Sequence, residues 1–241
     1  HGEIHIYDSI ESEGWRVGEE TSAAAFRDEL KALDGVKVID VRINSPGGDV
    51  FEATSIYNML KRHKARIDVY IDGVAASAAS VIAMAGDVIT MPQNAMLMIH
   101  NAWSVFMGDH NDFRKFADDL EKINESSVKQ AYLSKNPDLD IEELSKMMDA
   151  ETWLTANECL ELGLIDRLTE PMQAAASISK DFAARYKNIP PNLVEKKSNS
   201  LSGKDSQKIS VIHQSAIRLL NLINQILEFR KTETQNKKLC V

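Results

Sequence analysis

The chain has 241 residues, which is enough for one domain with a sizeable core and some length left over. Hydrophobic residues make up 44% and charged residues 27%, as in soluble globular proteins, and no apolar run reaches the ~20 residues that a membrane-spanning helix needs. The net charge of −8 argues against a general nucleic-acid binder, which would use Lys and Arg to neutralise phosphates, so neither a nucleic acid nor a membrane is an expected partner.

Cysteine usage gives an expectation for the cellular compartment. The chain has two cysteines, Cys159 and Cys240, which are far apart and match no metal-ligand spacing. This usage is typical of a reducing interior without a disulfide framework. The first residues show no basic region followed by an apolar stretch, so we expect no secretory signal and predict a cytoplasmic protein.

Residues 1–170 alternate between strand-like and helix-like patterns, which is typical of an α/β domain built from repeated strand–helix units. Gly35 suits the end of the first helix, and a Ser-Pro-Gly-Gly turn precedes the second. In the first half, the predicted strands are Gly2–Ile10, Val36–Ile43 and Ile67–Ile71, and the predicted helices are Ser22–Leu33, Asp49–Arg62 and Ala75–Ala85.

The second half contains the longest helical signal in the chain. In His110–Lys135, apolar residues keep to one face and charged residues occupy the other, which predicts an amphipathic helix. The apolar residues of that face are Phe113, Phe116, Leu120, Ile123 and Tyr132. The other predicted elements are strands Val88–Met91, Met96–Ile99 and Leu164–Leu168 and short helices Ile141–Met148 and Thr155–Leu162.

The character of the chain changes after Pro171. Residues 188–206 are rich in Pro, Lys and Ser without periodicity, which indicates a linker. We therefore predict a domain over residues 1–170, an extension and linker over 171–206, and an amphipathic helical tail over 207–241. We also expect a chain ending near Lys187 to stay folded. The apolar residues of the tail follow an a/d pattern, at Ile212, Ala216, Leu219, Ile223 and Ile226.

Ser77 is the first candidate for chemistry. It stands where a predicted strand passes into a predicted helix, among alanines whose small side chains leave room for a substrate carbonyl. Taken alone, the segment is more typical of a close-packed core helix. A serine in such a segment indicates a nucleophile only when other residues of the sequence could act as its base and oxyanion donors.

Two further motifs supply such matching residues. His100 ends the apolar strand Met96–Ile99, where a general base with a pKa near neutrality is useful. Gly47-Gly48 opens a helix, where backbone N–H groups lack intrahelical partners and can point at an oxyanion. A structural histidine and an ordinary tight turn explain each motif singly, but the ordered set fits acyl transfer.

The motifs resemble, in order and spacing, the blocks of the Clp protease proteolytic-subunit family. The matching stretches are Ile43-Asn-Ser-Pro-Gly-Gly48, Gly73-x-Ala-Ala-Ser77, Met98-Ile-His100, Trp153-Leu-Thr-Ala156 and Glu161-Leu-Gly-Leu-Ile-Asp166. The resemblance covers roughly residues 2–170. It implies an α/β fold of the crotonase-like kind, a spiral of β-β-α units, together with a Ser-His-Asp triad, an oxyanion hole and assembly into homo-oligomeric rings.

The resemblance also assigns site residues. Ser77 matches the nucleophile, His100 the base, and the N–H groups of Gly48 and Ala78 the oxyanion hole. Alignment on Trp153-Leu-Thr-Ala156 puts Glu151 at the position of the triad aspartate, with Asp149 as the alternative. A glutamate can orient an imidazole as an aspartate does, provided that its backbone lies slightly further from the histidine to accommodate the extra methylene group. We expect no metal or cofactor, and a polypeptide as the substrate.

Departures from the housekeeping members resemble phage and prophage head-maturation proteases, which process capsid or scaffold proteins. These departures are Asn101-Ala-Trp103 after the histidine, Asp49-Val-Phe-Glu52 after Gly48, and Glu151-Thr-Trp153. This resemblance implies capsid or scaffold proteins as partners and the bacterial host cytoplasm or the procapsid as the location.

The tail resembles a different family. Residues 202–241 are similar to the second helix of the dimerisation domain in hybrid two-component sensor histidine kinases. The phosphoacceptor helix of that family is absent from this sequence, so His213 is not predicted to be a phosphorylation site.

Three competing functions remain at this point. A crotonase-like enzyme acting on acyl thioesters would also use Gly-Gly donors but has no evident need for Ser77 and His100 together. A Ser-Lys peptidase of the signal-peptide-peptidase kind is disfavoured because His100 already supplies a base. A catalytically silent assembly protein would use the long amphipathic helix and the tail for oligomer contacts.

Overall fold

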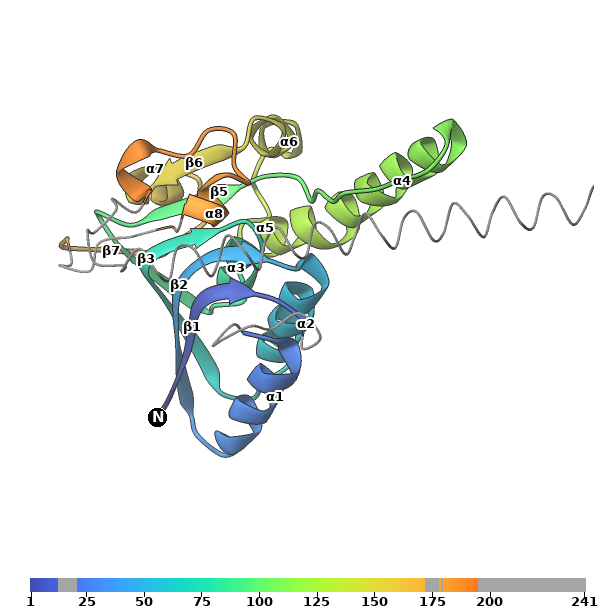
Figure 1. The fold of residues 1–241 in the computed structure, drawn as a ribbon. Coiled ribbons are helices and arrows are strands. Elements are labelled where there is room, and N and C mark those ends of the chain that lie inside the picture. The colour runs from blue at the N-terminus through green and yellow to red at the C-terminus, as the bar shows by residue number, and fades with distance from the viewer. Residues whose placement is uncertain (13–20, 172–177, 179, 195–241) are drawn as a thin grey trace, which may run out of the picture. The chain divides into compact units, whose positions relative to one another are not determined.

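The computed structural model describes residues 1–12, 21–171, 178 and 180–194 (Figure 1). The described residues belong to one compact unit, His1–Glu195, which we call the first unit. The predicted tail over 207–241, its resemblance to a kinase dimerisation helix, and the linker beyond residue 194 lie outside the described residues. Everything below concerns the first unit.

The core of this unit is a seven-stranded, mostly parallel sheet with strands and helices alternating along the chain. The main path of hydrogen-bonded neighbours runs β1-β2-β3-β4-β7, while β5 pairs with β3 and β6. The β5–β6 pair is antiparallel and the others are parallel. The strands are β1 Gly2–Ile10, β2 Val38–Gly48, β3 Arg66–Ala76, β4 Val88–Pro92, β5 Met96–Ile99, β6 Thr152–Thr155 and β7 Arg167–Thr169.

Helices follow most strands, and Figure 1 shows α1, α2 and α3 on the same side of β1 and β2. A π-helical turn, Asn124–Val128, joins α4 and α5, and a 3₁₀ turn, Pro191–Leu193, lies near the end of the described chain. The α-helices are α1 Ala23–Ala32, α2 Val50–Lys61, α3 Ala78–Ala83, α4 His110–Ile123, α5 Lys129–Lys135, α6 Ile141–Asp149, α7 Ala156–Glu161 and α8 Lys180–Ala183.

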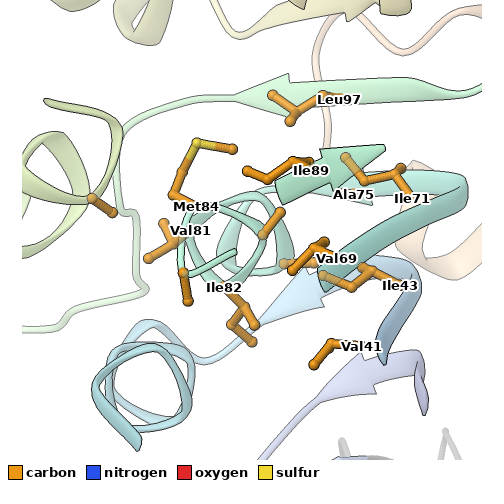
Figure 2. Packing of buried hydrophobic residues seen from close by; sticks show 14 of the residues in the cluster. Val41, Ile43, Val69, Ile71, Ala75, Val81, Ile82, Met84, Ile89 and Leu97 are labelled. Carbon is orange, nitrogen blue, oxygen red and sulfur yellow. The ribbon is translucent and has the colours of Figure 1, made fainter. Parts of the chain in front are cut away.

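Side-chain alternation in the strands builds the hydrophobic core. In β2, the buried residues Ile39, Val41 and Ile43 alternate with Asp40 and Arg42, because successive strand side chains point to opposite faces. Figure 2 shows side chains of β2 and β3 converging on α3. Residues of α3 are all buried, so this short helix lies inside the core and holds the end of β3 in place.

Side-chain caps determine where several helices begin. Ser22 Oγ accepts a hydrogen bond from the N–H of Ala25 at the start of α1. Asp49 accepts from the N–H groups of Phe51 and Glu52, which places the start of α2 immediately after Gly48. Such caps satisfy N–H groups that have no partner within the helix. We predicted a strand ending at Ile43 and then a turn, but β2 continues to Gly48, because Gly47 and Gly48 pair with Ser9 and Ile10 of β1.

The end of β3 differs from the sequence prediction. We predicted a helix over Ala75–Ala85, but Ala75 and Ala76 continue β3 and pair with Leu97 and Met98 of β5. The helix therefore begins only at Ala78. Alanine is compatible with either structure, and hydrogen bonds to a distant strand decided between them.

Two features near the end of the predicted domain also differ. The strand β6 was not predicted, because its four residues carry little pattern of their own and their pairing partner is β5. The last strand was predicted over Leu164–Leu168, but β7 is Arg167–Thr169. Leu164 and Ile165 are buried in the core before the chain joins the sheet.

The long amphipathic helix predicted over His110–Lys135 is helical throughout, as α4, the π-helical turn and α5. Its two ends have different surroundings. Val128, Ala131 and Tyr132 are buried in the core. None of the α4 side chains is fully buried, and Figure 1 shows α4 extending away from the sheet. Phe113 and Phe116 of α4 pack against Phe106 of the preceding loop, and Phe113 remains 51% exposed.

The first unit continues past residue 170, where we predicted the end of the domain. Ile178 and Val194 form a parallel β-bridge, and Ile178 and Leu193 are buried beside Val74 and Met98. Other apolar side chains pack against this second cluster, among them Trp153, Phe182, Tyr186 and Ile189. Residues 180–194, which we assigned to an extension and linker, therefore contact the sheet. Within the described ranges, no helix combines the length and apolar character required to span a membrane.

Candidate active site

Ser77 lies at the junction of β3 and α3 in an unusual backbone conformation. Its φ of 55° and ψ of −124° are outside the regions that residues with a side chain normally adopt. The surrounding structure holds it there: its N–H donates to the carbonyl of Met98, and its own carbonyl accepts from the N–H of Ser80. The neighbours Ala76 and Ala78 are buried, whereas Ser77 itself is partly exposed and lines a cavity.

His100 follows β5 and faces the serine. Its Nε2 is 2.7 Å from Ser77 Oγ, which is hydrogen-bonding distance. The two residues meet because β5 runs beside the end of β3. Burial lowers the pKa of His100, with Glu151 acting in the opposite direction and Lys187 adding to the lowering. The imidazole is therefore neutral near pH 7, as a general base must be.

Of the two acids that we considered, Glu151 faces the histidine. Its Oε2 is 4.0 Å from His100 Nδ1, which allows its charge to act on the ring but is too long for a hydrogen bond. Asp149 is exposed, and its Oδ1 accepts from Asn101 Nδ2 at 2.7 Å. Hydrogen bonds between catalytic groups are often long in substrate-free enzymes and tighten when substrate binds.

Glu151 is itself held in an unusual way. The residue is buried and has a φ of 52°, a left-handed conformation that is uncommon for residues other than glycine. Its Oε1 accepts from the backbone N–H groups of Lys187 and Asn188 at 2.7 and 2.8 Å. One carboxylate oxygen is thus anchored, and the other faces His100.

The Gly47-Gly48 pair, which ends β2, lies directly against the serine. A Cβ on Gly47 would lie 2.5 Å from the carbonyl oxygen of Ala76 and 2.9 Å from Ser77 Cβ, and its φ is 91°. A Cβ on Gly48 would lie 1.9 Å from the carbonyl oxygen of Ile10. Both positions therefore require glycine, and the absence of side chains lets the turn approach the nucleophile segment. Gly48 and Ala78 line the same cavity as Ser77 and His100.

This cavity has a volume of about 790 Å³. Ser77 and His100 line it, and the side chains around them are mostly apolar. These apolar residues come from the loop after His100 and from the inner face of the long helix, and include Trp103, Val105, Phe116, Leu120 and Ile123. The space and its lining suit an extended peptide with apolar side chains. Among the described residues, no group of three or more His, Cys, Asp or Glu side chains is arranged to hold a metal ion.

Sequence reasoning missed one part of the site, namely Tyr186, Lys187 and Asn188. The Tyr186 ring meets the His100 ring edge to face at a centroid distance of 5.9 Å, and its hydroxyl donates to the carbonyl of Pro46. These residues carry no periodic pattern and precede a Pro-Pro pair, and they fell within residues 171–206, which we assigned to an extension and linker. An aromatic residue next to the prolines was the one available signal.

Comparison with known families agrees with this arrangement. The family model described as Clp protease matches residues 16–172, which is more than half of the chain and includes Ser77, His100 and Glu151. Members of that family are serine-type peptidases, and a serine within hydrogen-bonding distance of a neutral histidine is the pair that such an enzyme needs. The chain belongs to the Clp protease family.

Proposed function

We propose that the protein is a serine endopeptidase that cleaves polypeptides through an acyl-enzyme. Ser77 Oγ attacks the substrate carbonyl carbon while its proton moves to His100 Nε2. The N–H groups of Gly48 and Ala78 hold the oxyanion, and the carboxylate of Glu151 stabilises the imidazolium. The single observation that carries this proposal is the 2.7 Å contact between Ser77 Oγ and His100 Nε2 at the cavity wall.

The remaining steps follow from the same groups. As the tetrahedral intermediate collapses, the C–N bond breaks and His100 gives its proton to the leaving amine. Water then attacks the ester carbonyl while His100 takes a proton from it. The ester bond to Ser77 Oγ breaks, Oγ regains its proton from His100, and the carboxylic acid product leaves.

The finer role that we propose is maturation of phage capsid or scaffold proteins, in the bacterial host cytoplasm or in the procapsid. The stretches Asn101-Ala-Trp103 and Glu151-Thr-Trp153 support it, because they resemble head-maturation proteases and differ from housekeeping subunits. We further propose a crotonase-like spiral for the domain and a homo-oligomeric ring for the particle. The exposed apolar side chains of Val105, Met107 and Phe113, on α4 and the loop before it, support an oligomer.

An alkyl fluorophosphonate tests the catalytic proposal, because it reacts with a serine that has both a base and an oxyanion hole. We expect the full chain to be labelled at Ser77, and Ser77→Ala to lose labelling and peptidase activity with an unchanged melting temperature. Ser145→Ala removes an exposed hydroxyl on α6 and is the matched control, with parental labelling. Absence of labelling in folded, assembled protein would favour a silent assembly protein instead.

A further inference from the structure

The segment Tyr186–Asn188 touches three parts of the proposed active site. Its backbone donates two hydrogen bonds to Glu151 Oε1, its tyrosine ring lies against His100, and its tyrosine hydroxyl donates to the carbonyl of Pro46. The Clp protease match ends at residue 172, so these contacts come from a part of the chain that follows the matched region.

The two backbone donors fix the direction of the Glu151 carboxylate. Hydrogen bonds offset the cost of burying a polar group, and here both donors meet the same oxygen, Oε1. With Oε1 anchored by Lys187 and Asn188, the carboxylate cannot rotate freely, and Oε2 is the oxygen that faces His100. The side chain of Asn188 strengthens this link, because its Nδ2 donates to the carbonyl of Ala150 at 2.8 Å.

Tyr186 links the histidine to the Gly-Gly turn. Its ring contacts His100 and also Trp153, whose centroid is 5.6 Å away in an edge-to-face arrangement, so the imidazole has a packed neighbour. Burial raises the pKa of Tyr186 well above its ordinary value, so the hydroxyl stays protonated and acts as a donor. It donates to Pro46, the residue directly before Gly47-Gly48, and thereby holds the turn that carries the proposed oxyanion donor.

We propose that Tyr186, Lys187 and Asn188 are positioning residues that hold Glu151, His100 and the Gly47-Gly48 turn in the arrangement needed for peptide cleavage. None of the three is required to touch the reacting atoms. The inference rests on the proposed function, since it assigns these residues a part in the same reaction. It makes the segment after residue 172 necessary for full activity.

The hydroxyl of Tyr186 is tested by Tyr186→Phe, which keeps the ring on His100 and removes the bond to Pro46. Loss of an oxyanion donor outright costs ~10²–10³ in kcat, so loosening its support should lower kcat about tenfold with little change in KM. Tyr186→Ala, which also removes the ring, should lower kcat further. Tyr186→Phe should therefore have a kcat between those of the Ala variant and the parent. Equal activity of the Phe variant and the parent would remove the hydroxyl from this role.

The backbone donors are tested by Asn188→Pro, which removes one N–H to Glu151, against Asn188→Ala, which keeps that N–H and loses the bond to Ala150. We expect the proline variant to label at Ser77 at least tenfold more slowly than the alanine variant, because a weakly held triad acid misdirects the imidazole. Equal labelling rates in two folded variants would contradict the positioning of Glu151. Should the proline variant unfold, the Tyr186 pair still decides the proposal.

A pH profile separates positioning from a merely structural role. The titratable groups around His100 are Glu151, Tyr186 and Lys187, and Lys187→Gln removes the positive charge while keeping the backbone N–H. Without that charge His100 binds its proton more tightly, so the loss of Ser77 labelling at acid pH should begin at a higher pH than in the parent. An unchanged profile would show that the charge of Lys187 does not act on His100.

The two proposals fail in distinguishable ways. If the parent protein is not labelled at Ser77, the proposed function falls. If the parent is labelled and the variants of Tyr186, Lys187 and Asn188 match it in rate and pH profile, the peptidase stands and the positioning segment alone is refuted.

Discussion

At the scale of single residues, the site depends on two side-chain-bearing residues in left-handed backbone conformations, Ser77 and Glu151. Such conformations cost of order 1–3 kcal/mol each and persist only where the surroundings hold them. Here the surroundings are hydrogen bonds, from the N–H of Ser77 to the carbonyl of Met98 in β5 and from the N–H groups of residues 187 and 188 to the carboxylate of Glu151. The strain is concentrated at the groups that we assign to catalysis.

The identity of the third triad member gives a prediction at this scale. Glu151→Gln keeps the size of the side chain but removes the charge that stabilises the imidazolium, so kcat should fall by ~10³–10⁴. Asp149→Asn should have a mild effect, because Asp149 is exposed and bonded to Asn101. Peptide hydrolysis by the two variants, with melting temperatures to verify folding, makes the comparison. The opposite ranking would transfer the role to Asp149.

The titration of His100 gives a second prediction. Burial is the largest influence and lowers its pKa, so the neutral base survives below the ordinary histidine pKa of about 6.5. Because the unfolded chain binds this proton more tightly than the folded one, the contribution of His100 to stability is complete above that value and is lost as the pH falls through the folded pKa. The rate of Ser77 labelling, measured from pH ~4 to ~8, should therefore fall only at pH values below about 6.5. A rate that already falls above this pH would contradict a lowered pKa of His100.

At the scale of elements, the helix α4 presents apolar side chains to solvent. Phe113 is 51% exposed, and Val105 and Met107 in the preceding loop are 85% and 79% exposed. A contiguous apolar surface of this kind favours burial against another molecule, and a second copy of the chain is the partner that we propose. The same helix also lines the catalytic cavity through Phe116 and Leu120, so assembly and substrate access involve one element.

Substitution on α4 tests this assignment. Phe113→Asp places a charge on the apolar face, and we expect the particle mass measured by light scattering to decrease, because burying an unpaired carboxylate is costly. Arg114→Gln changes the next, exposed residue and is the control with parental mass. An unchanged mass for the Phe113 variant would place the subunit contacts elsewhere.

At the scale of the whole molecule, the first compact unit, His1–Glu195, is the piece that we expect to suffice for activity. We expect a chain ending at Glu195 to remain folded and to keep Ser77 labelling, because it retains the packed segment from Ile178 to Val194. A chain ending at Lys187, which we expected from the sequence to suffice, loses the N–H of Asn188 on Glu151 and the buried Leu193.

The two truncations are compared by thermal melting and by fluorophosphonate labelling. The shorter chain should melt at a lower temperature and label more slowly than the longer one. If both behave like the full chain, residues 188–195 contribute nothing to the site. If the chain ending at Glu195 is inactive, residues 196–241 belong to the active particle.

The sequence alone indicated most of the strands and helices in their order, because apolar periodicity and turn residues are local signals, but it missed β6 and α8. It also singled out Ser77, His100 and the Gly-Gly turn, since small residues at a strand–helix junction and a histidine at a strand end are visible without any tertiary contact.

Tertiary structure decided the features that depend on distant partners. The pairing of Ala75 and Ala76 with β5 moved the start of α3 to Ala78 and set the backbone of Ser77. The preference for Glu151 over Asp149 depends on which carboxylate faces His100. The two acids are only two residues apart in the sequence, so their positions alone do not show which one faces the histidine. The contacts of Tyr186–Asn188, and the role that we propose for them, could not be predicted for the same reason, because backbone N–H groups have no sequence signature until folding brings them to a buried carboxylate.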